Sequence, residues 1–354
     1  MIQYIQQMNN PTYQNVHNSF KLNGFHLNKE DLCRVAYSFI KEGEDWEKPV
    51  GDFLLDWFDS KSFVEMTTSG STGIPKVIKV DKQAMVNSAL ATGDFFDLRS
   101  GDRALQCLPV KYVAGKMMLI RSIILGLDLD YVAPSSHPME NLEGFYDFAA
   151  MVPMQAQNSL QELKSIKKLI VGGARISKSL EKELMQIPTQ VFETYGMTET
   201  ITHIAAKKVG EKAFTVLPNV TISYDDRNCL VIHAPKIIAE DTVVTNDLVE
   251  LVNENQFLFL GRIDNIINSG GVKIMPEQVE KKLDGKIDRR FFITSKDDAE
   301  LGEKVILVVE GDSFNIDKTI FDHLDKYERP KEIVFVSKFK ETENGKVLRK
   351  ESLL

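Results

Sequence analysis

Cysteine is scarce in this sequence, and no spacing typical of a metal site or a redox motif occurs. The 354 residues contain three cysteines, Cys33, Cys107 and Cys229, which lie far apart and form no C-x-x-C pair. The six histidines show no metal-ligand spacing either. An odd number of scattered cysteines excludes a disulfide scaffold and indicates reduced thiols, which are typical of the cytoplasm.

Positive charge and long apolar runs are also lacking. The net charge of −8 argues against a nucleic-acid or anionic-membrane surface along the chain, so an anionic ligand would need a locally basic site. The longest apolar stretch, residues 113–127, contains Lys116 and Arg121 and is too short to span a bilayer. Residues 1–10 are polar and show no signal segment. We therefore expect a cytoplasmic protein with no membrane span and no nucleic-acid partner.

Length and hydrophobic content predict two or three domains, because 43% of the residues are hydrophobic. Between residues 82 and 194, predicted helices alternate with predicted strands, which is typical of helices packed on a largely parallel sheet. From 210 onward, hairpin patterns replace this alternation. The predicted fold class is α/β: a large N-terminal domain at 1–262 with mixed and parallel sheets flanked by helices, a small β subdomain within it at about 210–262, and a small α+β domain at 263–354.

Periodicity and turn residues locate the individual elements. Apolar residues at helical spacing predict a helix from Asn28, its cap, to about residue 41. Further helices are predicted at 51–58, 83–95, 115–125, 179–185, 276–283 and 316–326. Strands are predicted at 104–108, 129–132, 148–152, 168–171, 190–194, 290–294, 304–310 and 332–336, with hairpins at 220–233, 248–260 and 265–274.

Residues 67–76, Thr-Thr-Ser-Gly-Ser-Thr-Gly-Ile-Pro-Lys, concentrate small and hydroxylated side chains between two apolar segments. We predict a loop between two strands that binds phosphate, because glycines let the backbone approach a ligand and successive N–H groups form an anion nest. The spacing of a Walker A loop is absent. An ordinary polar loop is the alternative. The residues predicted to contact phosphate are Thr68, Ser69, Gly70, Ser71, Thr72, Gly73 and Lys76.

Other polar patterns follow predicted strands. Gly172-Gly173-Ala174 and Tyr195-Gly196-Met197 come directly after strands, at the carboxyl edge where parallel sheets bind ligands. Tyr195 could stack on a base, and Glu199 could hold a cation near its phosphates. A hairpin can bring Asp247 and Arg262 together, a pair that suits a ribose diol, although a surface ion pair of little energetic value is the alternative.

Taken in order, these motifs resemble the acyl-adenylate-forming superfamily of acyl- and aryl-CoA ligases, luciferases and peptide-synthetase adenylation domains. The resemblance covers about residues 63–350. The short N-terminal region and the segments 108–115 and 118–122 resemble the o-succinylbenzoate–CoA ligase branch of menaquinone biosynthesis. The matching motifs are residues 67–76, residues 195–200, Thr245-Asn246-Asp247, Gly261-Arg262-Ile263-Asp264, residues 269–277 and Gly345-Lys346.

The resemblance implies an ATP-dependent, AMP-forming acid–CoA ligase that uses Mg²⁺. It would convert o-succinylbenzoate, ATP and CoA into o-succinylbenzoyl-CoA, AMP and pyrophosphate through an acyl-AMP intermediate. Lys346, Glu199 and Thr198 are the implied catalytic residues, and Glu199 is also the implied metal ligand. The C-terminal domain is implied to be mobile and to rotate about Asp264 between the two steps. The implied nucleotide- and CoA-contacting residues beyond the loop are Gly172, Gly173, Ala174, Tyr195, Gly196, Met197, Asp247, Arg262, Gly270 and Gly271.

Two positions depart from the resemblance. Tyr112 stands in the acyl pocket where that branch usually has histidine, and Asn246 replaces the glycine of the Thr-Gly-Asp motif. A second carboxylate on the substrate would need a basic or hydrogen-bonding partner. Arg121, Lys111 and His203 are the candidates, with Tyr112 lining the aryl site, although Arg121 could instead be a solvated residue on a helix face.

Three other functions stay open at this point. The chain could be a ligase for another aryl or acyl acid, an adenylating enzyme that delivers to a carrier thiol, or a non-catalytic nucleotide-binding protein. The expected partner is a small-molecule carboxylic acid, and assembly into a homo-oligomer is left open.

Overall fold

The computed structural model describes residues 11–68, 76–341 and 347–353, without the side chains of Thr67, Thr68 and Lys76. Contacts divide the chain into two compact units. The predicted boundary after residue 262 falls inside the second unit, and it stays a prediction about which segments move together. Unit 1 comprises Met1–Ile176, Leu180–Thr221 and His233–Val243, and unit 2 comprises Ser177–Ser179, Ile222–Ile232 and Val244–Leu354.

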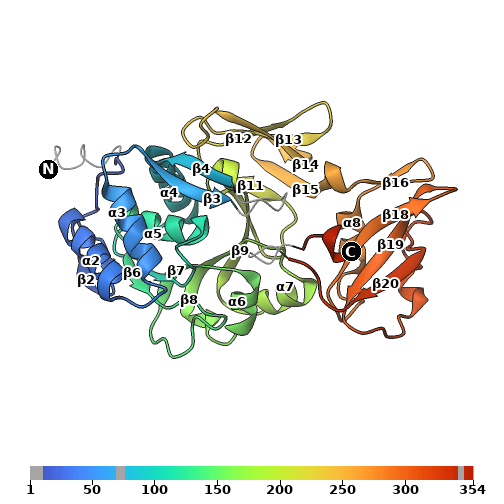
Figure 1. The fold of residues 1–354 in the computed structure, drawn as a ribbon, viewed down its shortest axis with the longest axis horizontal. Coiled ribbons are helices and arrows are strands. Elements are labelled where there is room, and N and C mark those ends of the chain that lie inside the picture. Colours follow the sequence, from blue (N-terminus) through green and yellow to red (C-terminus); the bar gives the residue numbers. More distant parts are fainter. Residues whose placement is uncertain (1–10, 69–75, 342–346, 354) are drawn as a thin grey trace. The chain divides into compact units, whose positions relative to one another are not determined.

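A largely parallel sheet forms the centre of unit 1 (Figure 1). Neighbouring strands from β9 to β1 are parallel, whereas β10, β11 and β2 run antiparallel to their neighbours. This arrangement confirms the α/β class that the alternation of elements predicts. In spatial order the strands are β11 (Phe214–Val216), β10 (His203–Lys208), β9 (Gln190–Gly196), β8 (Ile166–Val171), β7 (Tyr146–Met151), β5 (Arg103–Gln106), β6 (Asp128–Tyr131), β1 (Lys21–Leu22) and β2 (Phe25–His26).

The helices of unit 1 lie where the sequence predicts them, except α6, which was not predicted. Asn28 caps α2 (Lys29–Glu42) through a capping box, in which its Oδ1 accepts from the Asp31 backbone N–H at 3.0 Å. α5 (Val113–Leu125) is almost entirely buried, and Gly126 ends it in the left-handed conformation. The other helices are α3 (Lys48–Phe58), α4 (Lys82–Phe96), α6 (Pro153–Asn158) and α7 (Lys178–Leu184).

A separate two-stranded hairpin carries the Ser/Thr/Gly segment. β3 (Phe63–Thr68) pairs antiparallel with β4 (Lys76–Asp81), and the register places Phe63 opposite Asp81 and Thr68 opposite Lys76. The predicted strands on both sides of this segment are therefore confirmed, while residues 69–75 lie outside the described residues.

Unit 2 contains the predicted hairpins and a five-stranded sheet. β14 (Thr242–Asn253) pairs antiparallel with β15 (Gln256–Arg262), and β12 (Thr221–Tyr224) and β13 (Cys229–His233) precede β14 in the sheet order. The second sheet has the order β17-β16-β19-β18, with β20 beside β19. Its strands are β16 (Ile267–Ser269), β17 (Val272–Ile274), β18 (Phe291–Asp298), β19 (Gly302–Glu310) and β20 (Glu332–Val336).

One helix packs on this second sheet. α8 (Pro276–Leu283) begins at Pro276, as predicted, and buries Val279 and Leu283 against Ile293 and Leu307. The helix predicted at 316–326 is wrong: only a 3₁₀ turn at Lys318–Phe321 forms, capped by Asp317. β-branched and aspartate residues are poor helix formers, and burying Phe321 and Leu324 requires no longer helix.

Among the described residues, no helix is both long enough and apolar enough to cross a bilayer. This finding agrees with the short, charge-interrupted apolar stretch in the sequence.

Candidate functional site

The carboxyl ends of β8 and β9 form one edge of the sheet in unit 1. The two strands are parallel, with Val171 opposite Glu193, so the segments that follow them emerge side by side. The Oγ1 of Thr194 donates to the Val171 carbonyl at 3.3 Å. A Cβ added at Gly172 would lie 2.5 Å from this Oγ1 of Thr194. Gly173 has a φ of +85°. A side chain at Gly172 would displace the Thr194 hydroxyl from its hydrogen bond, and one at Gly173 is disfavoured by the positive φ, so both positions suit glycine.

Tyr195 lies at the same edge, one residue beyond Thr194. Its ring is half-buried, and its centroid lies 5.8 Å from that of Phe214 at an interplanar angle of 55°. The register pairs Tyr195 with Ala205 on β10. The residues predicted to flank a base, Tyr195 and the segment 172–174, are thus brought to neighbouring strand ends.

The turn after β9 is held tightly. A Cβ at Gly196 would lie 2.3 Å from the Thr202 carbonyl oxygen, so only glycine fits where β10 approaches. The Met197 backbone N–H donates to Oγ1 of Thr200 at 3.0 Å, and that hydroxyl donates to the Thr202 carbonyl at 2.7 Å. Ile201 has a φ of 66°, a strained conformation for a β-branched residue.

This turn carries the implied metal ligand. Thr198–Thr200 forms a 3₁₀ turn in which Glu199 is exposed and Thr198 is half-buried. The described residues contain no group of three or more His, Cys, Asp or Glu side chains that could hold a metal. A single exposed carboxylate nevertheless fits Mg²⁺, which is often bound by one or two carboxylates, substrate phosphates and several waters.

Arg121 and His203 meet inside unit 1. Arg121, on α5, is only 1% exposed, and its Nη2 lies 3.3 Å from Oγ1 of Thr202 and 3.4 Å from Nδ1 of His203. Its Nε is buried without an acceptor. The alternative of a solvated Arg121 on a helix face is therefore wrong. Two of the three residues predicted to bind the substrate's second carboxylate therefore lie together, although they are 82 residues apart in the sequence.

The hydrogen bonds around His203 assign its tautomer. Thr92 donates its hydroxyl to the Ser88 carbonyl at 2.9 Å, so its Oγ1 can accept from Nε2–H of His203, 3.4 Å away. The Nδ1 of His203 is then the acceptor that faces Arg121. Burial, together with the nearby positive charge of Arg121, holds the pKa of His203 well below its usual value, so the ring is neutral at pH 7.

Arg121 carries the positive charge of this pair. Burial lowers the pKa of its guanidinium well below the usual value, to about 9, so it remains protonated at pH 7. Among the described residues, no carboxylate lies within ion-pair distance of it. A buried cation with an unsatisfied N–H is costly by itself and is suited to an anionic ligand group. We name Arg121, His203 and Thr202 the buried basic cluster.

Tyr112 and Lys111 lie at the start of α5. Tyr112 is the half-buried residue that precedes the helix, and Nζ of the exposed Lys111 lies 4.9 Å from its ring centroid. A Cβ at Gly115 would lie 2.4 Å from the Pro109 carbonyl oxygen, so this glycine lets the helix start pack closely on the preceding loop. The same helix thus carries Tyr112 at its start and Arg121 along its length.

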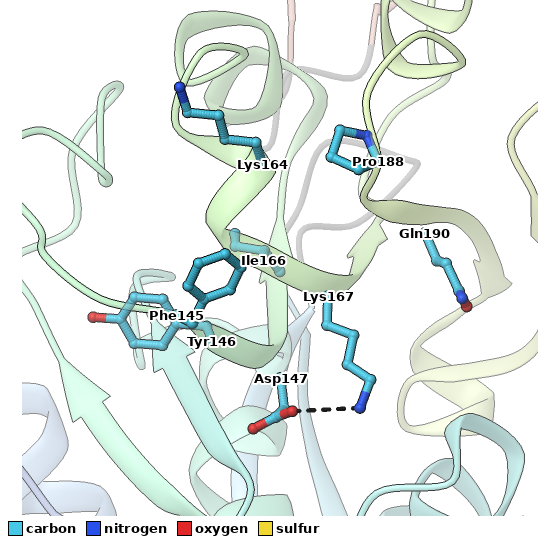
Figure 2. A pocket seen from close by; sticks show the side chains of 8 residues that line it. All are labelled: Phe145, Tyr146, Asp147, Lys164, Ile166, Lys167, Pro188 and Gln190. Atoms are coloured by element: carbon cyan, nitrogen blue, oxygen red, sulfur yellow. Dashed lines mark ion pairs between the residues drawn. The ribbon is translucent and has the colours of Figure 1, made fainter.

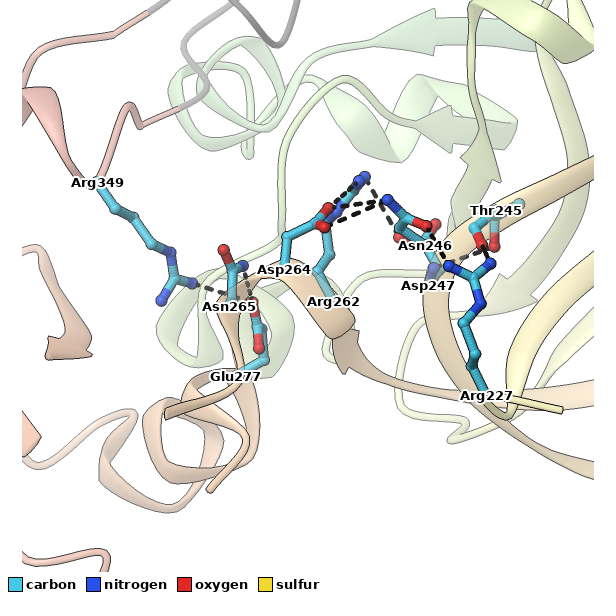
Figure 3. Close-up of polar contacts among 9 residues, drawn as sticks. All are labelled: Arg227, Thr245, Asn246, Asp247, Arg262, Asp264, Asn265, Glu277 and Arg349. Carbon is cyan, nitrogen blue, oxygen red and sulfur yellow. Dashed lines mark hydrogen bonds and ion pairs between the residues drawn. The ribbon is translucent and has the colours of Figure 1, made fainter. Parts of the chain in front are cut away.

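In unit 2 the predicted pair of Asp247 and Arg262 is formed (Figure 3). The register of β14 and β15 places them opposite each other, and Nη1 of Arg262 lies 3.4 Å from Oδ1 of Asp247. Asp247 is buried, and Arg262 also contacts Oδ2 of Asp264 through Nη2 at 3.0 Å. The alternative of a surface pair is wrong for the carboxylate, although the guanidinium is partly exposed.

The predicted CoA-side glycines form the turn between β16 and β17. Gly270 and Gly271 have φ angles of +59° and +81°, and the flanking Ser269 and Val272 are paired. Positive φ at both central residues is the type I′ geometry of a two-residue hairpin, which explains why both are glycine.

Some predicted residues lie outside the described ranges. Thr68 and Lys76 are placed through their backbones, opposite each other at the ends of β3 and β4. The predicted site residues that are not among the described residues are Ser69, Gly70, Ser71, Thr72, Gly73 and Lys346.

The sequence patterns missed several residues of these clusters. Thr92 and Thr202 contact His203 and Arg121, and Arg227 contacts Asn246 in unit 2. None stands in a motif. The one signal for the buried basic cluster was α5 itself, because a helix that is apolar on all sides is buried on all sides.

A shallow hollow on unit 1 lies away from these residues (Figure 2). Tyr146, Ile166 and Gln190 are the first residues of β7, β8 and β9, so it lies at the amino edge of the sheet, opposite the ligand-binding edge. It contains none of the predicted site residues. Its lining comprises Phe145, Tyr146, Asp147, Lys164, Ile166, Lys167, Pro188 and Gln190.

Known proteins resemble the chain along most of its length. The family of AMP-binding enzymes matches residues 60–224. An acyl-CoA synthetase (AMP-forming)/AMP-acid ligase II-like protein from Dyadobacter fermentans, of known structure, is 33% identical, with 90% of this chain and 97% of that chain covered and a TM-score of 0.61.

Two curated relatives are 2-succinylbenzoate–CoA ligases. Those of Salmonella typhimurium and Escherichia coli are each 26% identical, over 80% and 79% of this chain. The chain spans about two thirds of their length, 67% and 66%. The o-succinylbenzoate coenzyme A synthetase of Bacillus subtilis, solved with ATP and magnesium ion, is 22% identical over 82% of this chain and 69% of that chain, with a TM-score of 0.72, and shares the fold.

Proposed function

This chain belongs to the family of AMP-binding enzymes, and on that basis we propose that it is an AMP-forming acid–CoA ligase whose acid is o-succinylbenzoate. The names of the two curated relatives support the choice of acid. The reaction has two steps. An oxygen of the acid's carboxylate first attacks the α-phosphorus of ATP, and pyrophosphate leaves. The sulfur of CoA then attacks the acyl carbon of acyl-AMP, the thiol proton is released, and AMP leaves.

The first step brings two anions together, so the protein must supply positive charge where negative charge accumulates. We propose that Lys346 contacts the α-phosphate and the attacking carboxylate, and that residues 68–76 bind the β- and γ-phosphates. Mg²⁺, held through Glu199 with Thr68 or Thr198 nearby, would neutralise phosphate charge. The position of Thr198 and the exposed Glu199 on one 3₁₀ turn supports this last assignment.

The nucleotide's other parts have partners in the described residues. Tyr195 would stack against adenine, beside the backbone of the glycines Gly172 and Gly173 and of Ala174. Asp247 would accept hydrogen bonds from the ribose hydroxyls, with Arg262 holding its carboxylate. Gly270 and Gly271 would approach CoA in the second step.

The observation that carries the choice of substrate is the buried basic cluster. A protonated Arg121 without a carboxylate partner among the described residues, next to the neutral acceptor and donor groups of His203 and Thr202, suits the second carboxylate of a dicarboxylic acid. An acid with a single carboxylate would leave this cation unpaired, as it is in the free chain, and would gain none of the attraction that a second carboxylate gains. The proposed substrate pairs the cation and keeps the other carboxylate for adenylation.

A second candidate is a ligase for another aryl acid on the same scaffold. Tyr112 favours it, because its half-buried ring would give the acyl pocket a different surface from histidine. Delivery to a carrier-protein thiol in place of free CoA is a variant of either candidate.

A panel of acids tests these proposals. Pyrophosphate release is measured with o-succinylbenzoate, its succinyl monoester, benzoate, fatty acids and amino acids, each with and without CoA. We expect release with o-succinylbenzoate and thioester formation only when CoA is added. Activity confined to fatty acids or amino acids would defeat the choice of substrate, and no release with any acid would favour a non-catalytic protein.

We propose the cytoplasm as the compartment, since ATP and CoA are both substrates and the three cysteines are free thiols. Assembly into a homo-oligomer stays a prediction, and light scattering of the purified chain would test it.

A further inference from the structure

A chain of polar contacts crosses unit 2 and begins at the turn between β12 and β13 (Figure 3). The Nε of Arg227 donates to Oδ2 of Asp225 at 2.8 Å, and its Nη2 donates to the Thr245 carbonyl at 3.2 Å. The ion pair with Asp225 therefore holds the guanidinium to its own turn, and the contact with the Thr245 carbonyl holds it to β14. Its remaining nitrogen, Nη1, points to Asn246.

Asn246 is the middle of the chain. Its Oδ1 accepts from Nη1 of Arg227 at 3.2 Å, while its Nδ2 donates to both carboxylate oxygens of Asp264, at 3.3 and 3.2 Å. These partners fix the orientation of the amide. A reversed amide would place NH₂ against a guanidinium and an oxygen against a carboxylate.

The series of polar contacts ends at Asp247, the residue predicted to bind ribose. Asp264 also accepts from Nη2 of Arg262 at 3.0 Å, and Nη1 of Arg262 lies 3.4 Å from Asp247. Partial burial by itself raises the pKa of Asp264, but the hydrogen bonds from Arg262 and Asn246 outweigh it and hold the pKa below its usual value. Negative and positive groups thus alternate, with the neutral Asn246 joining Arg227 to Asp264.

The residue at the centre of this chain is the one that departs from the family pattern. The resemblance places glycine at position 246, and glycine has no side chain to contact Asp264. Asp264 occupies the predicted hinge position, where a change of φ would swing its Cβ relative to β14 and β15 and break both bonds to Asn246.

We propose that Asn246 is a positioning residue that latches the Asp264 carboxylate onto Arg262, keeps Arg262 beside the ribose ligand Asp247, and so favours adenylation over the CoA step. This proposal rests on the two-step function proposed above. A residue that holds the hinge in one state shifts the balance between two states by its differential contacts alone. Loss of the latch should weaken ATP binding and speed the step that requires the hinge to turn.

Single-turnover kinetics of the two half-reactions test the latch. Asn246→Ala should raise the ATP concentration for half-maximal acyl-AMP formation roughly 3- to 10-fold, the scale of one ordinary hydrogen bond, because the contact with Asp264 is exposed. The same variant should accelerate thiolysis of preformed acyl-AMP by CoA. Asn246→Asp should have a larger effect in both directions, because it places a carboxylate against that of Asp264.

A matched control lies on the same hairpin. Asn253 is also an asparagine on β14, but its Nδ2 donates to Oε1 of Gln256 at 3.0 Å at the turn. Asn253→Ala should leave both half-reactions unchanged. In an Asp264→Ala background, Asn246→Ala should have no further effect, because the two residues act through one contact.

Opposite changes in the two half-reactions support the latch, since mere structural damage would slow both. Equal slowing of both, or no change in either, overturns it. If the wild-type chain makes no acyl-AMP with any acid, the proposed function fails. Equilibrium ATP affinity then decides the latch: the proposal requires Asn246→Ala to bind ATP more weakly than Asn253→Ala, and equal affinities overturn it.

Discussion

Replacing Arg121 by methionine should stabilise the chain and remove its discrimination between acids with one and two carboxylates. Burial lowers the Arg121 pKa to about 9, well below the usual value of a guanidinium, so the folded chain holds this charge at a cost on the order of 5 kcal/mol. Because the unfolded chain binds the proton more tightly, the cost is constant below about pH 9 and is relieved only as the pH rises above that value.

Methionine has a similar volume and needs no hydrogen bonds. The two hydrogen bonds that the substitution removes, to Thr202 and His203 at 3.3 and 3.4 Å, are long and should contribute about 1 kcal/mol each. A further ~1 kcal/mol reflects the acceptor of His203 left without a donor. We therefore expect Arg121→Met to unfold with a free energy about 2 kcal/mol higher, as occurs when other buried ions are replaced by apolar residues.

Although Arg121→Met should raise stability, it should lower activity with o-succinylbenzoate. Truncating one partner of a buried charge pair costs about 2–5 kcal/mol, so kcat/KM for o-succinylbenzoate should fall roughly 10²-fold or more. The rate with a monocarboxylic analogue should change little. Pyrophosphate release with both acids, together with urea unfolding of the free chain, measures the two effects.

Lys116→Met is the matched control, because it removes a cation from the same helix outside the buried basic cluster. It should leave the ratio of the two acids unchanged. An Arg121→Met variant that is several kcal/mol less stable would show that Arg121 serves the fold, and an unchanged ratio of the two acids would show that it does not recognise the substrate.

Three further predictions concern other parts of the chain. Lys346→Ala should slow adenylation roughly 10²- to 10³-fold, as for loss of one preorganised charge-stabilising donor, but should largely spare thiolysis of preformed acyl-AMP; equal losses would contradict a role in the first step alone. His203 has a depressed pKa from burial and from Arg121, so the unfolded chain takes up its proton first, and the free energy of unfolding should fall as the pH drops below about 6.5. His203→Asn should remove this component in urea titrations at several pH values, whereas His26→Asn, at an exposed position, should not. Gly196→Ala should lower the free energy of unfolding by about 1–3 kcal/mol, because its Cβ meets the Thr202 carbonyl, and a neutral effect in urea unfolding would contradict the close approach of β9 and β10.

The order of elements could be predicted from local patterns because helix and strand periods are properties of neighbouring residues. The capped helix at Asn28, the alternation of strands and helices in unit 1 and the hairpins of unit 2 are all confirmed. The prediction of a helix at 316–326 was wrong because the same apolar spacing also fits a shorter turn. Ile316, Ile320, Phe321 and Leu324 all face one core, which gave a helical spacing, yet i→i+3 bonds satisfy that spacing with a short turn.

The pairing of Asp247 with Arg262 could also be predicted, since a hairpin sets its own register. The positions of Gly172 and Tyr195 at neighbouring strand ends followed from the parallel alternation in the same way. In each case the predicted contact depends on a few residues of strand and turn, and no distant part of the chain has to be placed.

Contacts between residues far apart in sequence could not be predicted in this way, because they depend on how whole elements pack. Helical periodicity could not place Arg121 beside His203, because that contact depends on how α5 packs against β10 and not on either segment alone. Likewise, the sequence showed only that Asn246 replaces the glycine of a motif. The folded structure places its amide between Arg227 and the carboxylate of Asp264. Local patterns were therefore sufficient for the elements, their order and the polar strand ends, whereas packing determined that Arg121 and His203 are buried together and that Asn246 contacts Asp264.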